Sequence, residues 1–152
     1  MRRYCVNRKS MEPEPALKLY RGLLRWAAER GDHFEFGYEP SMYDITDDVA
    51  RFQALGQVAG VSPQSCTNTV VVRGRLSEPF VVEMTRQGAP DRAAAGDESP
   101  VDFIVIYSGE RALYVSYDYG TVQTMDLTDS EVESLRQDLA HLGVESWRVV
   151  PL

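Results

Sequence analysis

Apolar residues recur with helical spacing in three segments of the chain. The first segment covers residues 15–30, with a proline in its first turn and a glycine directly after it. The second begins at Asp44, a residue type suited to a helix N-cap, and ends before Gly56. The third follows Thr128 and Glu131, which have the spacing of a capping box. We therefore predict three helices.

Strand-like patterns occupy most of the remaining sequence. Residues 33–38 alternate between aromatic and other side chains, as expected for a half-buried strand. Two β-rich runs separated by Ser77 and Glu78 predict a hairpin, and three later runs separated by short turns predict an antiparallel meander. A last short run closes the predicted sheet. The strands predicted after the first cover residues 69–76, 79–86, 101–108, 111–118, 121–127 and 146–150.

The order of these elements predicts one α+β domain over residues 13–152. In this domain a mostly antiparallel sheet of five to seven strands packs against the N-terminal and C-terminal helices, and the short second helix lies at an edge. Residues 1–12 are basic and polar without periodicity, so we expect a flexible arm there. Residues 56–68 and 87–100 are rich in glycine and proline and are predicted to be loops, the second of them mobile.

The charge of the chain is unevenly distributed. The 152 residues carry a formal net charge of -7, and the first ten residues hold four basic side chains and no acidic one. The rest of the chain therefore has 12 basic against 23 acidic residues, a net charge of -11. Such a body repels phosphate groups, so we do not expect it to bind nucleic acid directly.

The sequence also suggests where the protein is found. It has no run of about 20 apolar residues that would cross a membrane, and no apolar segment of a secretory signal follows Arg2 and Arg3. The two cysteines, Cys5 and Cys66, are too few for a disulfide framework. We therefore predict a cytoplasmic protein that does not bind membranes.

The sequence does not complete any of the motifs for catalysis or cofactor binding that it partly resembles. His33 and Glu35 have the H-x-E spacing of zinc deaminases, but Cys66 is the only thiol near the second half of that motif. Ser62 lacks the glycine pattern of a nucleophile elbow, and no glycine-rich phosphate loop is present. We therefore predict no catalytic residue, metal or cofactor, and favour a protein that is not an enzyme.

Acidic side chains and tyrosines suggest a binding role instead. Carboxylates attract and anchor a basic partner, while tyrosine rings supply contact area and a hydroxyl donor. We therefore predict a small acidic module that inhibits or regulates a basic protein, by analogy of charge and size with immunity proteins. The residues predicted to bind this partner are Asp44, Asp47, Asp48, Tyr114, Tyr117, Asp118 and Tyr119.

Two alternatives belong to other functional classes. In the first, the chain binds a small molecule or acts as an enzyme, with a pocket between the sheet and the first helix near His33, Glu35 and Cys66. In the second, the chain is a subunit of an oligomeric assembly. The first helix has a wide apolar face, and Leu19 and Trp26 at its margins would form the contact between subunits.

Overall fold

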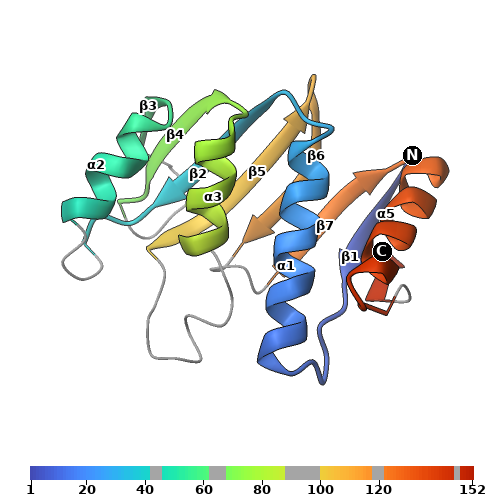
Figure 1. Ribbon diagram of the computed structural model, residues 1–152. Coiled ribbons are helices and arrows are strands. Elements are labelled where there is room, and N and C mark those ends of the chain that lie inside the picture. The colour runs from blue at the N-terminus through green and yellow to red at the C-terminus, as the bar shows by residue number, and fades with distance from the viewer. Residues whose placement is uncertain (42–45, 62–67, 88–99, 118–121, 146–147) are drawn as a thin grey trace.

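The chain folds into an α+β structure with two layers, an antiparallel sheet and a layer of helices (Figure 1). The computed structural model describes residues 1–41, 46–61, 68–87, 100–117, 122–145 and 148–152. Eight strands form one sheet in the order β3-β4-β2-β5-β6-β7-β1-β8. The strands are β1 (Arg2–Val6), β2 (His33–Tyr38), β3 (Gln57–Val61), β4 (Val70–Arg75), β5 (Val101–Ser108), β6 (Arg111–Tyr117), β7 (Val122–Leu127) and β8 (Val149–Pro151).

The helices of the described residues all lie on the same face of the sheet (Figure 1). Helix α1 contacts α3 on one side and α5 on the other, and α2 packs over the edge strand β3. In the described residues, no helix is both long enough and apolar enough to span a membrane. The helices are α1 (Pro13–Ala28), α2 (Thr46–Ala54), α3 (Glu78–Gln87) and α5 (Asp129–His141).

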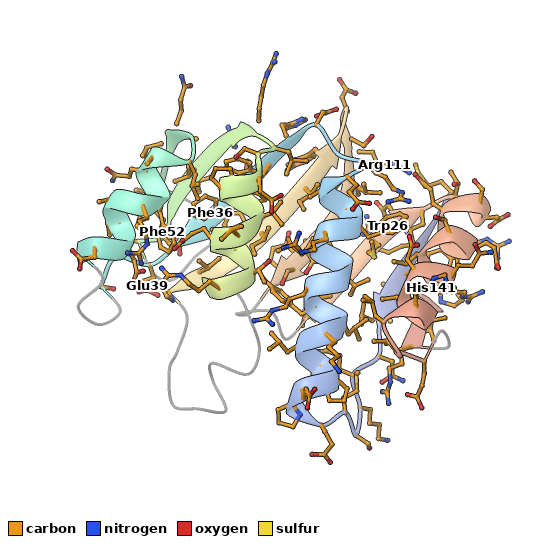
Figure 2. All side chains as sticks on the ribbon, viewed as in Figure 1. Trp26, Phe36, Glu39, Phe52, Arg111 and His141 are labelled. Atoms are coloured by element: carbon orange, nitrogen blue, oxygen red, sulfur yellow. The ribbon has the colours of Figure 1, made fainter. Side chains whose placement is uncertain are left out.

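A single apolar core fills the space between the two layers. Strand β2 contributes Phe34, Phe36 and Tyr38 to this core, because these residues alternate along the strand and all point towards the helices. The ring of Phe34 stacks on Phe80 of α3 at 3.9 Å. Phe36, labelled with Phe52 in Figure 2, meets this α2 residue edge to face at 5.5 Å. Aromatic contacts therefore hold α2 and α3 to the sheet.

Several predicted elements are confirmed. Helix α1 and the three meander strands β5, β6 and β7 lie where the sequence patterns place them. The capping box before α5 is complete, since the Thr128 hydroxyl accepts from the Glu131 N–H and the Glu131 carboxylate accepts from the Thr128 N–H. The α+β class and the antiparallel pairing are correct, although the sheet has eight strands rather than five to seven.

The predicted hairpin strand over residues 79–86 is wrong, because this segment forms helix α3. Its apolar residues Phe80, Val81 and Met84 are all buried, and their spacing places them on one side of a helix as well. The Ser77 hydroxyl accepts from the Phe80 N–H, which begins the helix. The packing of this segment in the helix layer therefore overrides the β propensity of its valines.

The N-terminus and the segment after α2 also differ from the prediction. Residues 2–6, expected in a flexible arm, form strand β1 between β7 and β8, and Arg3 pairs with Asp126 across the β1–β7 ladder. Residues 57–61, expected in a loop, form the edge strand β3. Both strands depend on partners far away in the sequence.

The last strand is β8, a short strand beside β1. Most of the loop predicted over residues 87–100 lies outside the described residues.

Candidate functional site

One of the acidic residues predicted to bind a partner, Asp48, already has partners within the chain. Asp48 pairs with Arg51 of the same helix and with Arg86 of α3. Asp47 is exposed in the first turn of α2, where it faces solvent. The intramolecular ion pairs of Asp48 reduce the charge that it offers to another protein. The other predicted partner residues Asp44, Asp118 and Tyr119 lie outside the described residues.

Two of the tyrosines predicted to bind a partner, Tyr114 and Tyr117, lie within the described residues, and the structure places them on opposite faces of the sheet. Tyr114 is completely buried in the core, and burial raises the pKa of its hydroxyl. Its ring is therefore removed from the predicted partner surface. Tyr117 lies on the face without helices, half-exposed, with its ring centre 6.3 Å from that of Phe103. Tyr117 and the α2 residue Asp47 thus lie on opposite sides of the sheet and do not form one docking surface.

The residues of the two alternative predictions are placed differently from what the sequence suggested. His33 and Glu35 alternate with the core residues of β2, so they lie on the face that points away from α1. Neither residue can therefore line a pocket between the sheet and α1. Cys66 lies outside the described residues. Leu19 and Trp26 are buried in the core of the chain, so they are not available to bind a second subunit.

The face of the sheet opposite the described helices, here called the open face, is a candidate binding surface (Figure 1). One continuous row of paired residues crosses all eight strands on this face. Its centre is apolar or weakly polar, at Val105, which is only 5% exposed, and at the partly exposed Val115 and Thr124, and its charged positions lie near one end. In order, the row is Gln57, Arg73, Glu35, Val105, Val115, Thr124, Cys5 and Val150.

Aromatic side chains lie on both sides of this central row. On one side Phe103 and Tyr117 are neighbours across β5 and β6, and Val122 of β7 is half-exposed beside them. On the other side the rings of His33 and Tyr107 stack at 4.8 Å, nearly parallel. Antiparallel sheets with one free face normally carry polar residues on it. This face instead has an aromatic and aliphatic band over β5, β6 and β7.

Ion pairs stand near the two ends of this band. The Arg3 side chain is 62% exposed, whereas its partner Asp126, with an Nε–Oδ1 distance of 2.7 Å, is only 22% exposed. In the same way Arg73 is 64% exposed and its partner Glu35 is 19% exposed. Hydrogen bonding to Arg3 lowers the pKa of Asp126, so this carboxylate remains charged. The guanidinium groups are therefore the more accessible halves of both pairs.

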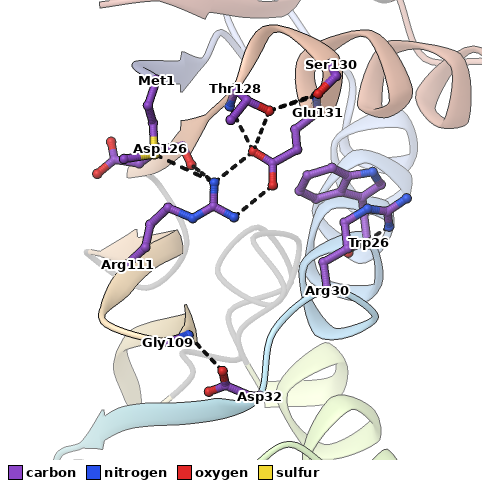
Figure 3. A network of polar contacts seen from close by, with 10 residues as sticks. All are labelled: Met1, Trp26, Arg30, Asp32, Gly109, Arg111, Asp126, Thr128, Ser130 and Glu131. Carbon is purple, nitrogen blue, oxygen red and sulfur yellow. Dashed lines mark hydrogen bonds and ion pairs between the residues drawn. The ribbon is translucent and has the colours of Figure 1, made fainter.

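Polar contacts also fasten the turn between β5 and β6 to the rest of the sheet (Figure 3). One carboxylate oxygen of Asp32 accepts from the Gly109 N–H at 2.7 Å, and the other contacts the His33 ring. The Gly109 hydrogen bond, followed by the contact with His33, lowers the pKa of Asp32. Because the His33 ring also stacks on Tyr107, these contacts fix the orientation of two aromatic rings on the open face.

The described residues contain no cluster of metal-binding side chains, and the chain has no match among known proteins. No three His, Cys, Asp or Glu side chains of the described residues lie close enough together to hold a metal ion. No family model, curated protein or solved structure matches the chain. The candidate site therefore rests on the geometry of the open face.

Proposed function

We propose that this chain is a small protein-binding module that docks a partner protein through the open face of its sheet. The observation that supports the proposal is the band of aromatic and aliphatic side chains on a face that the described helices leave uncovered. Burial of such side chains against a partner is favourable at about 25 cal/mol for each Å² removed from water. Tyrosine and arginine, both present on this face, are among the residues that contribute most to interfaces.

The dimensions of the face fit a contact between proteins. Eight strands have seven spacings of about 4.8 Å, so the sheet is about 34 Å wide. A strand of six residues is about 20 Å long, which gives the face an area of roughly 700 Å². A standard protein interface buries about 800 Å² on each partner. The open face is therefore large enough to contribute most of one side of such an interface.

The charge of the partner remains a separate part of the proposal. A net charge of -7 attracts a basic protein over long distances, and the role of inhibitor or regulator rests on the analogy of charge and size with immunity proteins. This version predicts association that slows as the salt concentration rises, because ions screen the attraction. Docking through the apolar band alone predicts association that depends little on salt.

The test compares three forms of the tagged chain in capture from a lysate of the native host. The open-face variant carries Tyr117→Glu and Val122→Glu, two substitutions at half-exposed positions. The control variant carries Leu142→Glu, because Leu142 is a similarly exposed apolar residue after α5 in the helix layer. We expect the wild type and the control to retain a stoichiometric partner that the open-face variant loses. Equal retention by all three forms would show that the partner binds elsewhere.

A further inference from the structure

A groove lies between helices α1 and α5, on the helix side of the sheet (Figure 1). Its volume is about 460 Å³, within the range of about 300–1,000 Å³ that is typical of small-molecule sites. Gly22 of α1 and Leu142, which directly follows α5, form the apolar middle of the groove. A Cβ atom at Gly22 would lie only 2.6 Å from Cδ1 of Leu142. Any larger residue at position 22 would therefore take up space in the groove.

Three cations of α1 line this groove. They are Lys18, Arg21 and Arg25, whose spacing of three and four residues places them on one side of the helix. Lys18 and Arg25 each pair with one exposed carboxylate, whereas Arg21 is exposed and has no ion pair among the described residues. An arginine without a carboxylate, in a chain whose net charge is -7, favours an anion as the ligand of this groove.

The carboxylates that line the groove are held by another cation. Glu29 and Asp138 both pair with Arg30, at N–O distances of 3.4 Å and 3.8 Å. Their negative charges are therefore partly neutralised within the chain, and they repel a bound anion less than free carboxylates would.

The indole N–H of Trp26 is a buried donor beside the groove. Trp26 lines the groove, although only 3% of its surface is exposed. Its Nε1 has no hydrogen-bond acceptor among the described residues, whereas buried N–H groups normally have one. The Arg30 guanidinium lies 4.3 Å from the centre of the ring and helps to fix its orientation (Figure 3). This donor favours a ligand that brings an acceptor.

We propose that the groove between α1 and α5 binds a small organic anion with an apolar body. The anionic group of the ligand pairs with Arg21, and a second acceptor receives the hydrogen bond of the Trp26 N–H. These two residues are five positions apart, which is about 7.5 Å along the helix axis. The two polar groups of the ligand therefore stand at opposite ends of a body of one or two rings, which covers Gly22. Leu142 is 46% exposed, so its side chain can move aside as the ligand enters.

An NMR titration of the isotope-labelled full chain with 6-hydroxy-2-naphthoate tests the proposal. This probe carries a carboxylate and a hydroxyl group at opposite ends of a rigid two-ring body. The chain has two tryptophans, so the indole N–H signal that remains in the Trp147→Phe variant belongs to Trp26. We expect this signal to shift and to saturate as the probe is added. A signal that does not move would overturn the proposal.

Two analogues of the probe separate the contributions of its polar groups. The amide of the probe has no charge, and 2-naphthoate has no hydroxyl group. We expect each analogue to bind about fivefold more weakly than the probe, the usual effect of losing one partly exposed ion pair or one hydrogen bond. Equal affinity of the amide would overturn the preference for an anion. Equal affinity of 2-naphthoate would overturn the role of the Trp26 donor.

Variants of the chain locate the site. Arg21→Gln should weaken binding of the probe about fivefold, whereas Arg75→Gln, which removes the same charge from an exposed residue of β4, should leave it unchanged. Gly22→Met should abolish binding, because a flexible side chain fills the groove. Methionine also has a higher helix propensity than glycine, so this variant should fold. Equal binding by the two arginine variants, or binding that survives Gly22→Met, would overturn the assignment to this groove.

This site and the proposed docking surface lie on opposite sides of the sheet, so the two proposals fail separately. The open-face variant Tyr117→Glu with Val122→Glu should bind the probe like the wild type. Leu142→Glu, the control of the capture test, should retain the protein partner but bind the probe more weakly, because it adds a carboxylate to the groove. A probe lost from the open-face variant and retained by Leu142→Glu would overturn the assignment to the groove.

Discussion

The Glu131→Gln variant tests how helix α5 is fastened to the sheet. The Glu131 carboxylate accepts two hydrogen bonds of 2.8 Å from Arg111 on β6 and one from the Thr128 N–H (Figure 3). Glutamine has the same shape and is also found at this position of capping boxes, so the substitution removes the charge and one of the two acceptor oxygens. The Arg111 guanidinium is then left partly buried without its carboxylate partner.

The size of the effect follows from the acidity of this carboxyl group. Hydrogen bonding to Arg111 lowers the pKa of Glu131 from an ordinary 4.5 to about 2. One pKa unit corresponds to about 1.4 kcal/mol, so the lower pKa sets an upper bound of about 3 kcal/mol on the stabilisation. The Glu131 side chain is 23% exposed, and solvent screening reduces that value. We expect Glu131→Gln to lower the free energy of unfolding by about 2 kcal/mol at neutral pH.

The dependence on pH distinguishes this charge effect from a loss of packing. A carboxylate with a lowered pKa stabilises the fold above the pKa of the unfolded chain, 4.5, and its contribution is lost as the pH falls towards the folded value of about 2. In urea unfolding, the difference between wild type and variant should therefore shrink at about pH 3 to less than half of its value at about pH 7.

A neighbouring residue provides the control for this experiment. Glu133 lies on the same helix, is exposed, and accepts a hydrogen bond only from Gln137 among the contacts of the described residues. Glu133→Gln should change the free energy of unfolding by less than about 0.5 kcal/mol. Equal effects of the two substitutions, or an effect of Glu131→Gln that stays the same at about pH 3, would refute the reasoning.

Three further predictions concern the core and the close packing of the sheet, and urea unfolding measures each of them. Leu23→Ala removes a fully buried side chain and should lower the free energy of unfolding by about 2–5 kcal/mol, whereas Val82→Ala at an exposed site should change it by less than about 0.5 kcal/mol. Tyr20→Phe leaves the buried Met84 carbonyl without its 2.9 Å hydrogen bond and should lower the free energy of unfolding by about 1–2 kcal/mol. Gly37→Ala would place a methyl group 2.3 Å from an aromatic ring of β5 and should destabilise by about 1–3 kcal/mol. An unchanged midpoint in Leu23→Ala, Tyr20→Phe or Gly37→Ala would contradict the close packing at that position.

The local elements of the fold are largely predictable from the sequence. The capping box fixes the beginning of α5, and alternation along β2 separates the core residue Phe34 from the outward-facing His33 and Glu35. Residues 79–86 are one exception, because their apolar spacing suits a strand or a helix equally. Contact with α1 and with Phe34 on the sheet decides that this segment is helix α3.

The candidate site is less predictable than the fold. The composition shows a surplus of acidic residues, but it cannot show that Glu35 and Asp126 are held in ion pairs with Arg73 and Arg3. The aromatic side chains of the open face come from β2, β5 and β6, and only the strand order brings them together. Tyr114 belongs to the same strand as Tyr117 and still lies in the core.

The sequence alone therefore determined the class of the fold, the positions of α1, α5, β2 and the meander, and the negative charge of the chain. These properties depend on periodicity, capping and counts of residues, all of which act over a few positions or over the whole chain. Only the tertiary structure decided that β1 and β3 are strands, that all described helices cover one face, and that β3 forms an open edge. Strand pairing and layer packing join residues that are distant in the sequence, and their free energies come from contacts that no local pattern records.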